Sequence, residues 1–195
     1  VLVAFHDDRL DRVTDQKGRI ADLDWAEVSH ARVHGREPIP RFEELLATWP
    51  GLRINIDPKD DSALAPLIKA LGRTGVLERV CAGCFSGRRL GQLRRALGPG
   101  LCTSMGPGEV VRLRFTSWGL PMGAFTALAA QVPLRHYGLP VVDQRFIQSA
   151  HARNLKVHVW TINDRATMNR LLDLEVDGIM SDETVLLKEV FMERG

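Results

Sequence analysis

The chain of 195 residues is 45% apolar and 26% charged, and its net charge is +2. This length is enough for one domain with a sizeable core, and the composition is that of a globular protein, which excludes a disordered chain. Acidic and basic residues are interspersed without a long run of one sign, which argues against a nucleic-acid partner, and no stretch reaches the ~18 apolar residues of a transmembrane segment. We expect a single domain over residues 1–195.

Short apolar runs alternate with amphipathic segments along the whole chain. The apolar runs predict strands at 1–5, 52–57, 79–85, 100–105, 127–133, 156–163 and 177–182. The amphipathic segments predict helices at 41–49, 61–73, 86–97, 109–118, 144–153 and 164–175. This alternation is typical of a parallel sheet with helical crossovers. Because the sequence contains no GxGxxG or GxxxxGK[ST] loop, it favours a (β/α) barrel over a dinucleotide-binding fold.

The cysteines and the clustered arginines bear on the compartment of the protein and on the kinds of site it could contain. Cys81, Cys84 and Cys102 are an odd number of cysteines, which favours a reducing compartment, and we expect a cytoplasmic protein. Cys81 and Cys84 form a CxxC in a predicted strand, where an offset of three places them on opposite faces, so a zinc or redox site is not expected. The arginines at 88, 89, 94 and 95 alternate with leucines and predict the solvated face of an amphipathic helix.

The first candidate for chemistry is His6, directly after the predicted strand 1–5. An imidazole titrates near pH ~6.5 and can exchange protons at neutral pH. The carboxylates of Asp7 and Asp8 follow it, and a neighbouring carboxylate can fix the tautomer of such a ring and raise its basicity. His6 is therefore a candidate general acid or base, and the alternative is a surface histidine at the end of a strand.

The second candidate is "NIDPKDD", in which Asp57 and Lys59 follow the predicted strand 52–57 at its carboxyl end. In a parallel α/β fold these ends lie on one face, where sites are built. A carboxylate is a ligand for a hard cation and an ammonium group binds phosphate, and residues two apart on an extended chain share a face. Asp57 and Lys59 could thus converge on one substrate, or they could form a structural ion pair. Trp160, inside the predicted strand 156–163, is a candidate for the site or for core packing.

Four segments, in order along the chain, together resemble the glycerophosphodiester phosphodiesterase family. They are "HDDRLDRVTDQKGRI", "PIPRFEELL", "INIDPK" and "VHVWTIN…VDGIMSD". The resemblance implies an α/β fold of the TIM (β/α)8 barrel type and a hydrolase of lipid and glycerol metabolism. Such an enzyme converts glycerophosphodiesters to an alcohol and glycerol 3-phosphate and uses a divalent cation, Ca²⁺ or Mg²⁺.

The resemblance also implies roles for single residues. His6 corresponds to one of the family's two catalytic histidines, Asp57 to one of its three metal carboxylates, Lys59 to its phosphate-binding lysine and Trp160 to a tryptophan of the site wall. In the family's scheme the glycerol hydroxyl of the substrate attacks phosphorus, and water then opens the cyclic phosphate. The implied partner is a small glycerophosphodiester, and related lysophospholipase D-type enzymes leave the head group open.

The sequence departs from the family pattern at two kinds of position. The family's H-R-G and E-x-D motifs, with the first βα unit and the second strand of the barrel, are absent, so we expect a domain that is incomplete at its N-terminus. We expect little hydrolysis from the 195-residue chain by itself, and a non-catalytic barrel that binds phosphodiesters or a partner subunit is the alternative. Glu175 stands where the family usually has glycine, at a left-handed helix end that costs a side chain about 1 kcal/mol.

Overall fold

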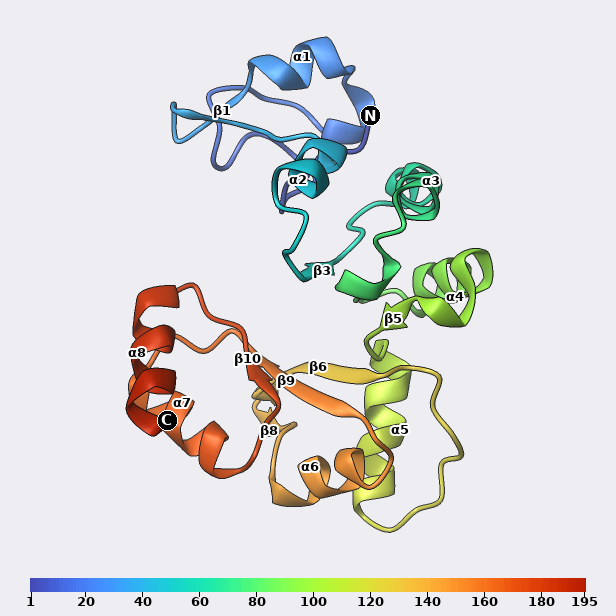
Figure 1. Ribbon diagram of the computed structural model, residues 1–195, viewed down its shortest axis with the longest axis vertical. Coiled ribbons are helices and arrows are strands. Elements are labelled where there is room, and N and C mark those ends of the chain that lie inside the picture. Colours follow the sequence, from blue (N-terminus) through green and yellow to red (C-terminus); the bar gives the residue numbers. More distant parts are fainter. The chain divides into compact units, whose positions relative to one another are not determined.

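The computed structural model describes the backbone of residues 1–195 and every side chain except that of Thr74, and helices and strands alternate along it (Figure 1). The helices are α1 (Trp25–His30), α2 (Phe42–Thr48), α3 (Leu64–Thr74), α4 (Gly87–Leu97), α5 (Pro107–Ser117), α6 (Gln144–His151), α7 (Arg165–Asp173) and α8 (Thr184–Arg194). The strands are β1 (Arg32–Val33), β2 (Glu37–Pro38), β3 (Ile54–Ile56), β4 (Val80–Ala82), β5 (Cys102–Thr103), β6 (Ala129–Pro133), β7 (Arg135–His136), β8 (Leu139–Pro140), β9 (Lys156–Trp160) and β10 (Gly178–Ile179).

The chain divides into two compact units. Unit 1 comprises residues 1–84 and 88–102, and unit 2 comprises residues 85–87 and 103–195. A single domain over the whole chain stays a prediction. Among the helices that the structure describes, none has the length and apolar character needed to cross a membrane.

The central sheet of unit 1 has the strand order β3-β4-β5, with β3 and β4 parallel. Val80 and Ala82 of β4 are buried against apolar side chains of α2, α3 and α4. Because successive side chains of a strand point to opposite faces, Asn55 and Cys81, which are paired in register, lie on the other face of this sheet. Because Val80 and Ala82 are buried on one face of the sheet, the side chain of Cys81 between them lies on the opposite face.

The N-terminal part of unit 1 differs from the prediction. Residues 1–5 form no strand, and Val3 makes only an isolated antiparallel bridge with Arg41. A small core of Leu10, Val28, Ala31 and Ile39 lies beneath α1 and the β1–β2 hairpin instead. An apolar run predicts burial, but strand formation also requires a partner strand, which the run itself does not specify.

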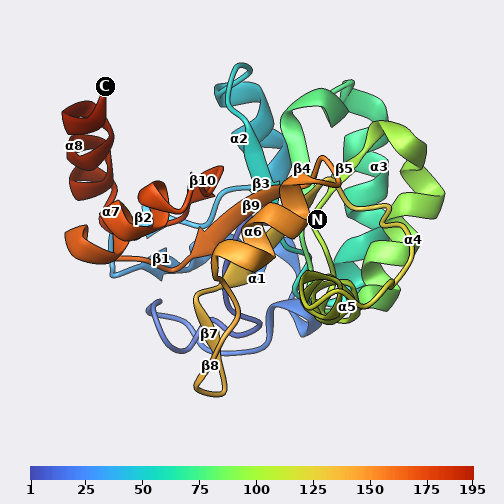
Figure 2. The ribbon, with the colours of Figure 1, turned by 90° about the horizontal axis from the view of Figure 1, so that it is seen from below.

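The sheet of unit 2 has the order β10-β9-β6, and both of its pairings are parallel. Val157 and Val159 of β9 are fully buried in the main core of this unit, whereas Trp160 lies half-buried on the opposite face. The backbone of residues 103–105 extends the pairing, because the N–H of Met105 donates to the carbonyl of Ala129 at 2.8 Å. The exposed hairpin of β7 and β8 projects from the rest of unit 2 (Figure 2).

Local chemistry explains where the helices begin and end. The side chains of Asp143 and Asp164 accept hydrogen bonds from the backbone N–H groups three residues later and cap α6 and α7. Gly75 ends α3 with a φ of 62°. Glu175 follows α7 with a φ of 65°, so the left-handed conformation expected from the family comparison is confirmed at a residue that has a side chain.

Candidate active site

His6 does not follow a strand, because residues 1–5 form none. Its ring contacts Asp7, and Asp7 in turn is bound by Arg12. The Nδ1 of His6 is 2.7 Å from Oδ1 of Asp7. Asp7 in turn accepts hydrogen bonds from Nε of Arg12 at 2.5 Å and from Nη2 of Arg12 at 2.9 Å. The His6 side chain is 78% exposed and the Asp7 side chain only 17%, so the ring faces solvent while its carboxylate partner is held against the protein.

The hydrogen bonds from Arg12 stabilise the charged form of Asp7. They hold the pKa of this carboxyl well below its usual range, with a smaller contribution from His6. Asp7 is therefore ionised at neutral pH. A carboxylate next to Nδ1 favours the tautomer that carries its proton there, which leaves the lone pair of Nε2 for a reacting group.

Asp57 and Lys59 lie in the loop that follows β3, as the sequence predicts. The Nζ of Lys59 is 2.6 Å from Oδ2 of Asp57, so the two side chains do converge. Both remain about one-third exposed, at 31% for Asp57 and 36% for Lys59. An ion pair of this kind is accessible to a phosphate group or a cation, which could take up either partner.

The structure brings His6 and Lys59 to one open pocket of unit 1. The pocket is lined by His6, Asp7, Asp8, Arg9, Asp11, Arg12 and Lys59. All of these residues have polar or charged side chains, and both signs of charge are present, which is suited to a small charged ligand. His6 and Lys59, which are about fifty residues apart in the sequence, thus line the same pocket.

Trp160 belongs to unit 2, where it ends β9. Its ring meets that of Phe85 edge to face, with 5.7 Å between the centroids and 82° between the planes. Phe85 is 69% exposed, so the pair is an aromatic surface and not part of a core. The sequence does not single out Phe85, because an apolar residue at the end of a predicted strand ordinarily indicates core.

Two other polar residues predicted at strand ends also meet in unit 2. The side-chain amide of Asn163, just after β9, donates to Asp182 at 3.0 Å. The amide oxygen of Asn163 accepts from the backbone N–H of Asp182 at 3.0 Å and from the hydroxyl of Ser181 at 3.1 Å. These bonds join the loops that follow β9 and β10.

The members of the CxxC have different partners, and Cys84 lies beyond the end of β4. The Sγ of Cys84 donates to the carbonyl of Pro58 at 3.5 Å, whereas Cys81 is hydrogen-bonded to Cys102 of the next strand. The bond from Cys81 lowers the pKa of the Cys102 thiol to about 7.

The expectation that the arginines of α4 form a solvated face is wrong for Arg89. Its side chain is only 22% exposed and contacts the loop after β3.

A divalent cation would find one suitable ligand in this site. The carboxylate of Asp57 is a hard oxygen donor, partly exposed, and located after the carboxyl end of a parallel strand. Within the described part of the chain there is no group of three or more His, Cys, Asp or Glu side chains placed to share an ion. Asp57 could therefore supply one ligand to a divalent cation whose other ligands would be water and substrate phosphate.

Comparisons with known proteins agree on one family. The sequence profile of the "Glycerophosphoryl diester phosphodiesterase family" matches residues 1–186. The curated "Probable glycerophosphodiester phosphodiesterase 2" of Mycobacterium tuberculosis is 34% identical over 200 residues, which cover 100% of this chain and 76% of that protein.

Solved structures of this family share the fold. One is a phosphodiesterase of Oleispira antarctica in complex with the product sn-glycerol-3-phosphate, with a TM-score of 0.75, 19% identity, and coverage of 97% of this chain and 78% of that one. Another is the glycerophosphodiester phosphodiesterase of Agrobacterium tumefaciens, with a TM-score of 0.71, 19% identity, and coverage of 95% and 79%. The predicted TIM-barrel class is thereby confirmed.

Enzymes of this family generally depend on a divalent cation. The match covers nearly the whole sequence and is supported by the structural neighbours and by the charged pocket that His6 and Lys59 line. The chain belongs to the glycerophosphoryl diester phosphodiesterase family of phosphoric diester hydrolases.

Proposed function

We propose that this chain hydrolyses glycerophosphodiesters to an alcohol and sn-glycerol 3-phosphate, with catalysis by His6 and binding by Lys59, Asp57 and a divalent cation. The observation that carries the proposal is the pocket in which His6 and Lys59 meet, with Asp57 paired to Lys59. The product named for the Oleispira antarctica phosphodiesterase supports the choice of substrate.

His6 serves as one of the proton-transferring groups. Asp7 orients the ring through Nδ1 and is itself held by Arg12, so Nε2 is the atom that exchanges a proton with the substrate. In the first step the glycerol hydroxyl of the substrate bonds to phosphorus and gives up its proton, while the bond between phosphorus and the oxygen of the departing alcohol breaks and that oxygen receives a proton. Water then opens the cyclic phosphate to give glycerol 3-phosphate. A positioned acid or base contributes about 10²–10⁴-fold to such a step.

Lys59 and Asp57 bind the phosphodiester. The ammonium group of Lys59, 36% exposed, balances the charge of a non-bridging phosphoryl oxygen. Asp57 provides one oxygen ligand to the cation, which supplies charge neutralisation at phosphorus when it is bound. The Lys59–Asp57 ion pair of 2.6 Å would then be exchanged for contacts with phosphate and cation.

Trp160, which is half-buried beside the exposed ring of Phe85, is proposed as a wall of the substrate site because it corresponds to the family's site-wall tryptophan. The edge-to-face contact with Phe85 fixes the orientation of the indole. Such a surface contacts the glycerol or head-group part of a substrate without touching the reacting atoms. Its contribution is to affinity more than to the chemical step.

The test compares variants of the natural protein that contains this chain, with glycerophosphocholine and lysophosphatidylcholine as substrates and Mg²⁺ or Ca²⁺ added to the metal-free protein. Asp57→Asn is expected to raise the cation concentration for half-maximal activity by about tenfold, since loss of a charged ligand weakens hard-cation binding. Trp160→Phe is expected to raise KM with kcat nearly unchanged. Asp22→Asn, at an exposed residue outside the pocket, is the control.

If Asp57→Asn and Trp160→Phe both behave like the wild type, the assignment of these residues is wrong. The relative kcat/KM of the two substrates decides between a glycerophosphodiesterase and a lysophospholipase D-type activity.

A further inference from the structure

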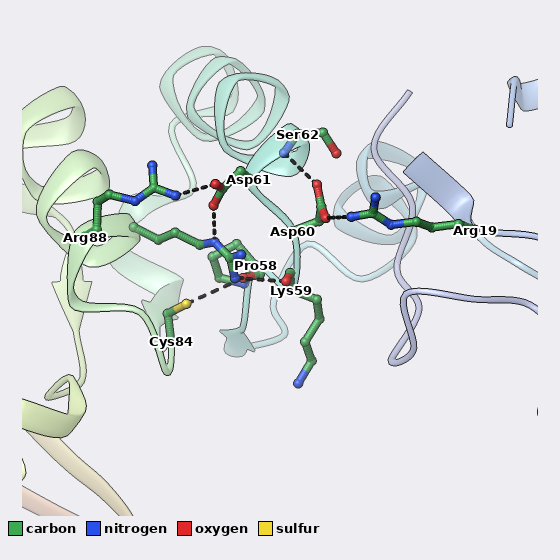
Figure 3. A network of polar contacts seen from close by, with 9 residues as sticks. Arg19, Pro58, Lys59, Asp60, Asp61, Ser62, Cys84 and Arg88 are labelled. Carbon is green, nitrogen blue, oxygen red and sulfur yellow. Dashed lines mark hydrogen bonds and ion pairs between the residues drawn. The ribbon is translucent and has the colours of Figure 1, made fainter. Parts of the chain in front are cut away.

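The loop between β3 and α3 is held in place from outside by arginine side chains. This loop, residues 57–60, carries both Asp57 and Lys59 and leads into a short 3-10 helix, Asp61–Ala63. Figure 3 shows the contacts that surround it. They come from the start of α4 and from Arg19 near the N-terminus of unit 1.

Arg89 of α4 makes the largest number of these contacts. Its Nη1 donates to the carbonyl of Pro58 at 3.2 Å and to the carbonyl of Lys59 at 2.8 Å. Its Nε donates to Oδ1 of Asp61 at 2.5 Å. One planar guanidinium therefore binds three acceptors in four successive residues, a geometry that the single ammonium group of a lysine cannot reproduce.

Two further arginines bind the acidic residues that follow Lys59 in the sequence. Arg88 pairs with the second carboxylate oxygen of Asp61, and Arg19 binds Asp60 at 2.7 Å. The other oxygen of Asp60 accepts from the backbone N–H of Ser62 at 2.9 Å. The side chain of Lys59 points away from this network while its carbonyl faces Arg89, so the contacts hold its backbone and leave its ammonium group paired with Asp57 alone among the residues of this loop (Figure 3).

We propose that Arg89 is a positioning residue that holds the loop of Asp57 and Lys59 in the geometry required to bind phosphodiester and cation. This inference rests on the proposed function, since it assigns to Arg89 a purpose in that site. Arg89 touches neither Asp57 nor the ammonium group of Lys59 through the bonds described, and acts through the carbonyls of Pro58 and Lys59 and the carboxylate of Asp61. Partners that orient metal ligands in this way typically contribute about 10–100-fold to affinity or activity.

The experiment compares Arg89→Met and Arg89→Lys in the natural protein, with Arg95→Met as the control at an exposed arginine of the same helix. Hydrogen exchange of the amides of residues 59–62 is measured with no ligand present. The KM for glycerophosphocholine, the Mg²⁺ concentration for half-maximal activity, and Tm are measured beside it. Arg88→Met, which removes one bond to Asp61 and none to a carbonyl, separates the ion pair from the backbone contacts.

Both Arg89 variants are expected to speed exchange of the loop at least tenfold and to raise KM and the Mg²⁺ requirement about tenfold, with kcat largely recovered at saturating substrate and Mg²⁺. Arg95→Met should match the wild type, and Arg88→Met should show a smaller effect. Unchanged exchange in Arg89→Met and Arg89→Lys would overturn the proposal, as would faster exchange with unchanged KM and Mg²⁺ requirement. Absence of hydrolysis in the wild type would refute the proposed function, and the exchange rates would then decide alone whether Arg89 holds the loop.

Discussion

At the scale of single residues, His6 depends on its neighbours for orientation more than on packing. With 78% of its side chain exposed, the ring has little protein around it, and the 2.7 Å contact with Asp7 is what restricts it. Arg12 binds both oxygens of Asp7 and so fixes the carboxylate in turn. This is the arrangement of a proton-transferring group, its carboxylate partner and a residue that orients the partner.

The variant Asp7→Asn tests this arrangement. It keeps the size of the side chain but removes the charge that favours the Nδ1–H tautomer, and kcat is expected to fall by about tenfold to a hundredfold with KM little changed. Because hydrogen bonding to Arg12 holds the pKa of Asp7 far below its usual range, the wild type should show no loss of activity from protonation of Asp7 between pH 5 and 8. Steady-state kinetics over that range measure both effects, and an unchanged kcat in Asp7→Asn would remove Asp7 from the site.

At the scale of elements, the ends of helices and strands carry most of the specific chemistry. Asp143 and Asp164 cap helices, the loop after β3 in unit 1 carries the Asp57–Lys59 pair, and the loops after β9 and β10 in unit 2 are joined by Asn163 and Asp182. The opposite ends of the strands of unit 2 have their own polar contact, in which Asp177 joins α6 to β9. Stability and activity are therefore expected to respond to different substitutions.

Glu175→Gly is expected to stabilise the protein. Glu175 has a φ of 65° after α7, a conformation that costs a residue with a side chain about 1 kcal/mol and costs glycine little. Thermal unfolding should show a rise in Tm of about 2–4 °C. Glu175→Ala, which keeps the steric cost, is the control and should resemble the wild type; a loss of stability in Glu175→Gly would show that other contacts of the glutamate outweigh the strain.

Asp177→Asn is expected to destabilise the protein in a pH-dependent way. Burial tends to raise the pKa of Asp177, but hydrogen bonds from Lys156, the Val157 N–H and His151 outweigh it and hold the pKa below its ordinary value of 3.8. A group with a lowered folded-state pKa stabilises above its unfolded pKa and loses that contribution as the pH falls through the folded value.

The cost of Asp177→Asn at pH 7 should be about 1–3 kcal/mol in the free energy of unfolding, and it should shrink below pH ~4. Urea unfolding at pH 7 and at pH 3 measures the difference. The exposed Asp173→Asn provides the control, because it removes only a surface ion pair with Arg194. A cost for Asp177→Asn that is the same at both pH values would contradict the electrostatic origin.

At the scale of the whole molecule, the pattern of apolar runs predicts most of the fold. All six predicted strands from residue 52 onward contain an observed strand, namely β3, β4, β5, β6, β9 and β10, because period and punctuation are local properties. The run 1–5 fails as a strand, since pairing depends on a distant segment and only Val3 finds a partner. Helix α8 was not predicted, as its apolar residues follow no single face.

The same distinction explains which parts of the site could be predicted. Asp57 and Lys59 are two residues apart, so their convergence follows from strand geometry, and His6 stands beside the acid that orients it. The contact of Arg89 with the carbonyls of Pro58 and Lys59 joins residues about thirty apart, and nothing in the helix pattern distinguishes Arg89 from the other arginines of α4. Contacts between different helices and loops depend on tertiary packing, which the pattern of residues along the sequence does not specify.

The central claim, hydrolysis of glycerophosphodiesters by way of His6, is tested most directly by ³¹P NMR of the products formed from glycerophosphocholine by the natural protein with Mg²⁺. We predict a single new phosphorus signal, that of sn-glycerol 3-phosphate, and the release of one equivalent of choline. The rate of hydrolysis by His6→Ala is expected to be lower than that of the wild type by at least about a hundredfold. Release of phosphocholine, no product at all, or an undiminished rate in His6→Ala would contradict the account.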